Sequence, residues 1–340
     1  NHMPMKSSKN IMWAMLLTFL LGYMASTATA GSDGKIKAAQ GKEQPLEPVR
    51  ESELTKELHN KNISARWKSA DLGVKLPTYF TDTKPNVVNR SACLDKVFNV
   101  LCHSNRPLRI LQLGDSHVAG NSYPRAVKQT LENAWGAALA DSIQTGVEYS
   151  YIGSNGATTV RFATPAYMEK VAQKNPDLII LSFGTNECHG MGYREAQHRE
   201  QLENFYAMLK ETCPDAVIMM TTPPGDYLTT RNVKYVRRGS GRKRRKVTRS
   251  VSRVNPMSVR CAAELESFGE EHGLPVWDLN TIAGGDDAQR NWKSASLMRP
   301  DRIHFTPEGY TLQGRLLGEA ILSAYNQYLR NNQSTTNNPS

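Results

Sequence analysis

Short apolar runs alternate with longer amphipathic stretches along the chain from residue 109 onward. The runs predict strands at 109–113, 147–152, 177–183, 216–221 and 275–278. Apolar side chains at helical spacing predict helices at 123–135, 165–173, 194–211, 255–272 and 307–329. Strands that alternate with helices form a parallel sheet covered on both faces, and ligands bind at the carboxyl ends of its strands.

The polar flanks of this pattern set the expected domain limits. Residues 31–91 are rich in Lys and Glu and weakly periodic, which predicts a linker or loosely attached arm. Residues 92–330 form the expected α/β domain, and the Asn-rich stretch 331–340 is expected to be a disordered tail. We expect this protein to be a monomer.

The first thirty residues resemble an export signal preceded by an expression scar, Asn1-His2-Met3. Lysines precede an apolar stretch at 11–25, and Ala28-Thr29-Ala30 follows as a small-x-small cleavage site. The alternative is a membrane anchor, but a span needs about 20 apolar residues. We therefore expect export to the periplasm or the extracellular space, with no stable membrane span.

Charge is concentrated in one segment. The formal net charge is +10, and residues 227–254 hold eleven Lys and Arg with no Asp or Glu, so the rest of the chain is close to neutral. Short strands around Gly239-Ser240-Gly241 predict a basic hairpin insertion at 231–250. The alternatives are a solvated loop and a docking arm for an anionic polymer. Arg237 and Arg238 are its candidates for substrate contact, and the scarcity of aromatic residues argues against nucleic acid.

The five cysteines do not form a disulfide framework. A bridge between Cys213 and Cys261 is one alternative, and buried free thiols are the other. The Cys and His spacing does not suggest zinc, and we expect no metal.

A candidate nucleophile follows the first predicted strand, in the sequence Gly114-Asp115-Ser116-His117. A serine on a strand-to-helix turn exposes its hydroxyl at the carboxyl edge of the sheet. Asp301 and His304 lie just before the last predicted helix. His304 is the candidate base for Ser116, and Asp301 would hold the imidazole in the useful tautomer.

Acyl transfer also needs donors for a developing oxyanion. The sequence offers the backbone N–H groups of Ser116 and Gly156 and the side-chain amide of Asn186, each after a predicted strand. His117 and Glu187, which adjoin Ser116 and Asn186, are further candidates for substrate contact. Cys188 and His189, slightly further on, are interpreted as structural.

Taken together, these blocks resemble the SGNH (GDSL-type) hydrolases, named for Ser, Gly, Asn and His. Ser116, Gly156, Asn186 and the pair Asp301–His304 match the four blocks over about residues 92–330. The resemblance implies a three-layer α/β/α, flavodoxin-like fold with five parallel strands, and no required cofactor.

Within that family, the sequence is most similar to the peptidoglycan O-acetylesterase branch. Gly114-Asp115-Ser116-His117-Val118-Ala119-Gly120 and the block 302–310 carry this similarity. It implies an exported serine esterase that deacetylates a glycan, O-acetylated peptidoglycan, through an acetyl-enzyme. One alternative is a carbohydrate O-acetyltransferase that uses the same site. The other is an anionic-polymer-binding protein with a vestigial triad.

Overall fold

The computed structural model describes residues 85–138, 146–237 and 244–336. The predicted scar and signal peptide, and most of the polar arm, lie outside these residues. Within the described ranges, every helix is too short or too polar to cross a bilayer.

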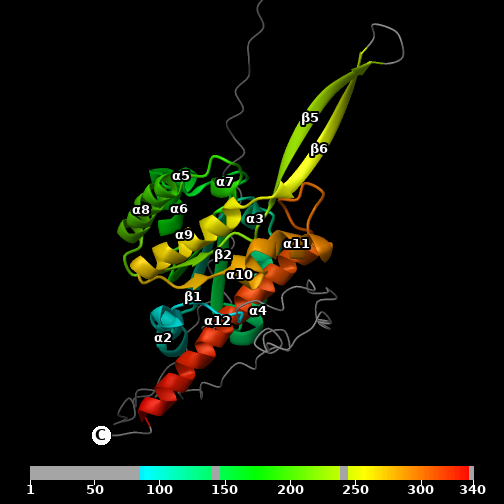
Figure 1. Cartoon of the computed structure of the whole chain (residues 1–340). Helices are drawn as coiled ribbons and strands as arrows, with labels where there is room; N and C mark the ends of the chain where they lie inside the picture. Colours follow the sequence, from blue (N-terminus) through cyan, green and yellow to red (C-terminus); the bar gives the residue numbers. More distant parts are fainter. Residues whose placement is uncertain (1–84, 139–145, 238–243, 337–340) are drawn as a thin grey trace, which may run out of the picture. The chain divides into compact units, whose positions relative to one another are not determined.

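A five-stranded parallel sheet forms the centre of the domain (Figure 1). Its order is β2-β1-β3-β4-β7. The strands are β1 (Leu108–Gly114), β2 (Val147–Gly153), β3 (Leu178–Ser182), β4 (Val217–Thr221) and β7 (Val276–Trp277). The predicted five-stranded parallel sheet is thus confirmed, and each predicted strand agrees with an observed one to within two residues.

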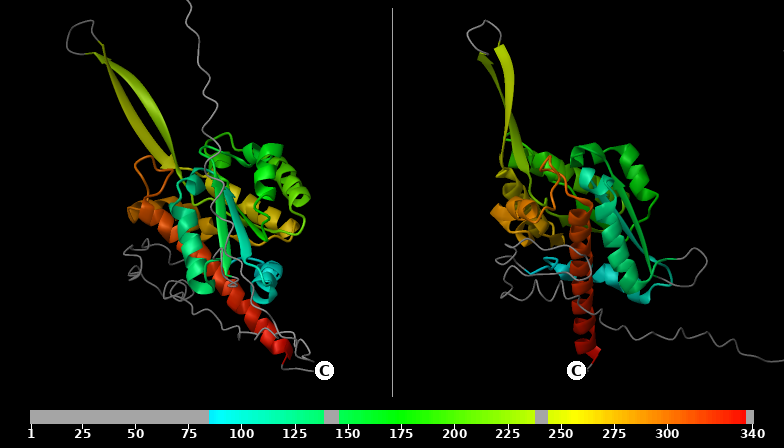
Figure 2. Two further views of the ribbon diagram at one scale, coloured as in Figure 1. Left: turned by 180° about the vertical axis from the view of Figure 1, so that it is seen from behind. Right: turned by 90° about the vertical axis from the view of Figure 1, so that its right-hand side faces the viewer.

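Both faces of the sheet are apolar and covered by helices, seen from two further directions in Figure 2. Successive strand residues point to opposite faces. Ile110 and Ile180 therefore pack with one group of helices, while Leu111 and Ile179 pack with the other. The first group is α2 (Asp95–His103), α4 (Ser122–Trp135) and α12 (Pro307–Thr336); the second is α6 (Pro165–Ala172), α8 (Glu195–Thr212) and α9 (Met257–Glu271).

Short helices at the ends of strands and in connections complete the domain. They are η2 (Ser91–Leu94), α3 (Ser116–Ala119), α5 (Thr159–Phe162), α7 (Thr185–Cys188), α10 (Leu279–Ile282), η3 (Gly285–Asp287) and α11 (Ala288–Ser294). Apart from η2, the sequence pattern did not predict these elements, because helices of one or two turns are too short to show a period.

The basic segment forms a separate antiparallel ribbon of β5 (Tyr227–Arg237) and β6 (Arg244–Val254). It extends away from the sheet and its helices in each view (Figures 1 and 2). The predicted insertion at 231–250 was too short, because Thr and Val recur along both strands and the pairing continues to Tyr227 and Val254.

Two predicted domain limits need correction. The packed domain begins before residue 92, since Asn86 is fully buried, receives a bond from Trp277 Nε1 at 2.9 Å and donates to the carbonyl of Leu316 at 2.8 Å. The predicted tail at 331–340 is also partly wrong, because α12 continues to Thr336. All five cysteines are free thiols, so no Cys213–Cys261 bridge is formed.

Candidate active site

The candidate nucleophile lies where the chain reverses its direction across the sheet. The chain passes from β1 outward to β2, then back across β1 to β3. Such a switch point opens a crevice at the carboxyl ends of the strands. β1 ends at Gly114, Asp115 caps α3 by accepting the N–H of His117 at 2.8 Å, and Ser116 is the first residue of α3.

The serine helix lies directly on the end of β2. A Cβ at Gly153 would lie 2.2 Å from the backbone nitrogen of Ala119 in α3, so only glycine permits this contact. The close approach holds Ser116 against the sheet edge, and its hydroxyl lies where the strands end.

Ser116, His304 and Asp301 form a continuous hydrogen-bonded chain. The Ser116 Oγ lies 2.9 Å from His304 Nε2, and His304 Nδ1 lies 2.9 Å from Asp301 Oδ2. With a proton on Nδ1, the ring donates to the carboxylate and accepts the serine proton at Nε2. The two residues predicted to meet are 188 positions apart in the sequence, and the fold brings them into contact.

A tight loop fixes the carboxylate of this triad. Asp301 Oδ1 accepts the backbone N–H groups of Ile303 at 3.0 Å and His304 at 2.9 Å. Partial burial raises the pKa of Asp301, but these two N–H groups and the imidazole outweigh burial and leave the pKa below its ordinary value. The carboxylate of Asp301 is therefore ionised at neutral pH and can offset a positive charge on the ring of His304.

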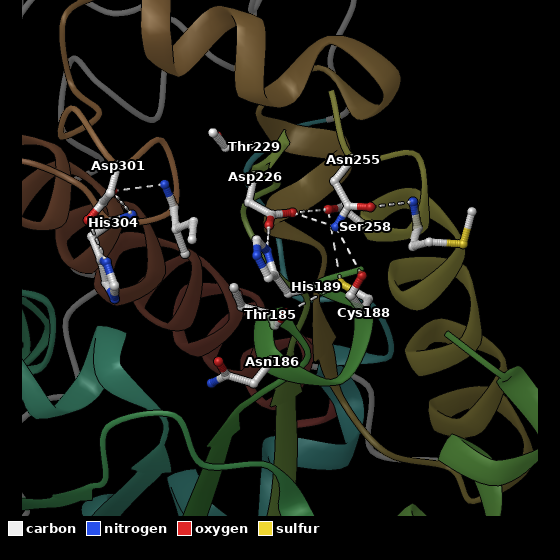
Figure 3. Close-up of polar contacts among 12 residues, drawn as sticks. Thr185, Asn186, Cys188, His189, Asp226, Thr229, Asn255, Ser258, Asp301 and His304 are labelled. Carbon is white, nitrogen blue, oxygen red and sulfur yellow. Dashed lines mark hydrogen bonds and ion pairs between the residues drawn. The ribbon is translucent and has the colours of Figure 1, made fainter. Parts of the chain in front are cut away.

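The candidate oxyanion donors come from three neighbouring strands. The backbone N–H groups of Ser116 and Gly156 have no carbonyl partner among the described residues. Gly156 has a φ of +67°, and a Cβ there would meet open space, so glycine serves the backbone conformation. Asn186, in α7 after β3, directs its amide nitrogen toward the side of His304 (Figure 3).

Asn186 is held in place by the loops around it. Its Nδ2 donates to the carbonyl of Ala157 at 2.9 Å and to Asp115 Oδ2 at 3.3 Å. Burial raises the pKa of Asp115 to about 7, against the opposing effects of the His117 N–H and the charge of His304. Asp115 thus braces both the nucleophile turn and the candidate oxyanion amide.

His117 and Glu187, two candidates for substrate contact, are engaged with the protein. His117 is 5% exposed, and its Nδ1 lies 2.9 Å from the hydroxyl of Tyr310. Glu187 accepts the N–H groups of Thr159 and Gly184, each at 2.9 Å, and so joins the starts of α5 and α7. In this structure both side chains support the loops around the site.

Both residues have strongly shifted pKa values. Burial, followed by the nearby charge of His304, lowers the pKa of His117 to about 3, although the carboxylates of Asp226 and Asp301 oppose the shift. Burial raises the pKa of Glu187 to about 7. His117 is therefore a neutral imidazole at neutral pH.

The two arginine candidates belong to the end of the ribbon. Arg237 is the last residue of β5, and its side chain lies outside the described set. Arg238 lies outside the described residues altogether.

A second imidazole–carboxylate pair at this edge was not foreseen from the sequence. His189 Nδ1 is hydrogen-bonded to Asp226 Oδ2. His189 directly follows α7, and Asp226 directly precedes β5. The two residues are 37 positions apart and match no local motif, so no signal in the sequence could have paired them.

The root of the ribbon joins this pair to the triad loop. The backbone N–H of Tyr227 donates to the carbonyl of Arg302 at 3.0 Å, and Arg302 lies between Asp301 and His304 in sequence. The Tyr227 ring also faces the guanidinium of Arg302 at 5.7 Å and the ammonium of Lys293 at 5.4 Å. Ribbon and triad loop are thus fixed to each other.

Comparison with known proteins identifies relatives by family and by fold. The GDSL-like Lipase/Acylhydrolase family model matches residues 113–312, a range that contains Ser116, Gly156, Asn186, Asp301 and His304. No curated protein matches the chain.

Solved structures share the fold at low identity. One described as a peptidoglycan O-acetylesterase in action is 16% identical, with a TM-score of 0.55, over 72% of this chain and 98% of that one. A lipase/acylhydrolase from Enterococcus faecalis is 22% identical, with a TM-score of 0.40, over 64% and 96%. A two-domain esterase active on acetylated mannans is 13% identical, with a TM-score of 0.46, over 71% and 56%. The three-layer fold expected from the resemblance to SGNH hydrolases is confirmed.

Proposed function

Because this chain belongs to the GDSL-like lipase/acylhydrolase family, we propose that it is an exported serine esterase that removes O-acetyl groups from a cell-wall carbohydrate, O-acetylated peptidoglycan. The observation that carries the proposal is the 2.9 Å contact of Ser116 Oγ with His304 Nε2, backed by Asp301. The likeness in fold to a peptidoglycan O-acetylesterase supports the choice of substrate, and the export signal in the sequence supports the location.

In the proposed reaction, the oxygen of Ser116 forms a bond to the acetyl carbon as its proton passes to His304 Nε2. The carbonyl oxygen becomes negatively charged and is stabilised by the N–H groups of Ser116 and Gly156. The amide of Asn186 joins them by exchanging its long contact with Asp115 Oδ2, at 3.3 Å, for the oxyanion. The bond to the sugar oxygen then breaks, and His304 protonates that oxygen. An acetyl group remains on Ser116.

Hydrolysis of this acetyl-enzyme repeats the sequence with water. His304 takes a proton from water as the water oxygen attacks the acetyl carbon. The bond between that carbon and Ser116 Oγ then breaks, and His304 returns a proton to the serine oxygen. Throughout, the carboxylate of Asp301 offsets the positive charge that forms on the ring. Acetic acid and the free sugar hydroxyl are the products.

The test removes the nucleophile. Ser116→Ala should lower kcat/KM for acetate release from O-acetylated peptidoglycan, and from p-nitrophenyl acetate, by about four orders of magnitude or more. Ser323→Ala, in the middle of α12, is the matched control. It lies sixteen residues beyond the start of that helix, about 24 Å along its axis, and should retain activity. Retained turnover by Ser116→Ala would defeat the proposal.

The alternatives identified from the sequence make different predictions in the same assay. An acetyltransferase would pass the acetyl group to a chitooligosaccharide acceptor faster than to water. A polymer-binding protein with a vestigial triad would show no turnover with either ester. The assembled contacts of Ser116, His304 and Asp301 favour an enzyme over the binding protein.

A further inference from the structure

The pair His189–Asp226 is a second imidazole with a fixed orientation at the edge of the sheet that carries Ser116. His189 is the C-cap of α7, the short helix that holds Asn186. In Figure 3 the ring of His189 lies above the side chain of Asn186, and the triad base His304 lies to the left of both. The hydrogen bond to Asp226 engages Nδ1. Nε2 has no partner among the described residues.

The carboxylate of Asp226, which accepts the hydrogen bond of this ring, is buried and fixed by further hydrogen bonds. The residue is 1% exposed, and its Oδ1 accepts from Asn255 Nδ2 at 2.7 Å and from Ser258 Oγ at 2.8 Å. Its Oδ2 receives the bond from His189. Three donors, two at the start of α9 and one at the end of α7, therefore converge on one buried carboxylate. This fixes the direction of the imidazole, as a carboxylate behind a functional histidine does.

The carboxylate also favours a charged ring. The hydrogen bond that His189 donates to Asp226 raises the pKa of His189, and this effect outweighs the opposing effect of partial burial. The side chain of His189 is 35% exposed, so a solute can reach it. A protonated ring with Nδ1 occupied presents one N–H, at Nε2, and a positive charge.

The surface next to this ring is cationic over a long distance. The ribbon starts at Tyr227, directly after Asp226, and carries exposed basic side chains on both faces. Those with described side chains are Arg231, Lys234, Lys246, Arg249 and Arg253. None of them forms an ion pair with another described residue. Unpaired like charges along one exposed element favour an anionic ligand.

We propose that His189, oriented by Asp226, binds a carboxylate of the glycan next to the acetyl group that is cleaved, so that the enzyme selects acetylated glycans that carry carboxylates over neutral ones. The inference rests on the proposed function and adds a substrate class to it. His189 is the specificity-determining contact, Asp226 is its positioning residue, and the ribbon extends the cationic surface away from the site.

The experiment compares two forms of one substrate. Soluble O-acetylated peptidoglycan fragments with free carboxylates are assayed beside the same fragments with those carboxylates converted to amides. We expect the unmodified protein to show a kcat/KM about tenfold or more higher for the free carboxylates, carried mainly by KM, and to lose part of this preference as ionic strength rises.

His189→Gln keeps an N–H donor but removes the charge. It should bring the ratio of the two kcat/KM values close to one. Asp226→Asn, which leaves an imidazole without its counter-charge, should reduce the ratio by a smaller factor. His272→Gln is the matched control, because His272 also contacts a carboxylate, Glu203 at 2.9 Å, but lies at the end of α9 that leads to the amino-terminal end of β7. It should keep the ratio of the unmodified protein.

Two results separate failure of this inference from failure of the proposed function. If the unmodified protein deacetylates both fragments equally, or if His189→Gln slows both by the same factor, the carboxylate site is disproved and the esterase remains. If p-nitrophenyl acetate is hydrolysed but neither fragment releases acetate, the glycan substrate is wrong and the carboxylate site falls with it.

Discussion

His304 and His189 both direct Nδ1 at a carboxylate, but the two pairs are built in opposite ways. His304 takes its carboxylate from three residues earlier in one loop, where the Asp301 side chain is 45% exposed. His189 takes its carboxylate from 37 residues later, where the Asp226 side chain is 2% exposed. At Nε2, His304 meets a serine hydroxyl, whereas His189 has no partner in the described part of the chain.

The difference shows that an imidazole–carboxylate pair does not by itself define a base. What marks the first pair as the candidate base is the hydroxyl of Ser116 at hydrogen-bond distance, together with candidate donors for a substrate oxyanion at the ends of neighbouring strands. What assigns binding to the second pair is a reachable Nε2 and a rigid, buried carboxylate behind it. Substitutions in the first pair should therefore lower the reaction rate. Substitutions in the second pair should lower the free energy of unfolding and change the preference between substrates.

Asp301→Asn tests whether the first pair acts in the reaction itself, and it should have the largest effect on kcat/KM. Oδ1 of the new amide can still accept from Ile303 and His304, but its NH₂ would face Nδ1 and favour the wrong tautomer of the ring. We expect kcat/KM for p-nitrophenyl acetate to fall about 10³- to 10⁴-fold with the fold unchanged.

The same change on the other pair is the control. Asp226→Asn should lower kcat/KM for p-nitrophenyl acetate by less than about tenfold, because this small ester has no carbohydrate for His189 to contact. Equal losses for the two variants would mean that both pairs act on the reacting ester, and the division of roles would be wrong.

Asp226→Ala tests whether the second pair contributes more to the free energy of unfolding than the first pair does. Removal of this carboxylate leaves the donors of Ser258 and Asn255 without their buried acceptor and opens the root of the ribbon. We expect the free energy of unfolding to fall by about 3 kcal/mol in urea denaturation. Asp301→Ala, at a much more exposed site, should cost less than about 1 kcal/mol. A larger loss for Asp301→Ala would contradict the comparison.

The first pair could be predicted from the sequence, and the second could not, for a physical reason. Asp301 and His304 lie on one loop, where the backbone itself sets their separation, and Ser116, Gly156 and Asn186 each follow a strand whose carboxyl end faces the same edge. Once the parallel sheet is predicted, these positions meet. The core follows in the same way, because strand periodicity assigns each apolar residue to a face.

His189 and Asp226 meet only through tertiary detail. Their contact depends on where α7 ends and on how the loop after β4 enters the ribbon, and neither is encoded in a local period. The length of the ribbon was underestimated for a related reason: a two-stranded ribbon without a packed face lacks the apolar alternation that marks buried strands. His189 was accordingly interpreted as structural.

The smallest expected effect is a shift in the titration of His189, and it examines the second pair directly. Its pKa in the folded protein is raised above the ordinary value of about 6.5. In an NMR titration, the His189 signal, assigned by its loss in His189→Gln, should show a midpoint above that value, and Asp226→Asn should bring the midpoint back toward it. A midpoint at or below the ordinary value in the unmodified protein would contradict the role given to Asp226.

The raised pKa of His189 also determines the direction in which its contribution to the free energy of unfolding changes with pH. Because the folded-state pKa exceeds the unfolded one, the stabilisation from the charged ring is complete at pH values below about 6.5 and is lost as pH rises through the raised value. The difference in the free energy of unfolding between the unmodified protein and His189→Gln should therefore be constant at low pH and shrink across that window. Asp115 and Glu187, whose pKa values of about 7 fall in a similar range, are present in both proteins and largely cancel in the difference. A difference that grew with pH would mean that the neutral ring, and not the imidazolium, is the form that Asp226 holds.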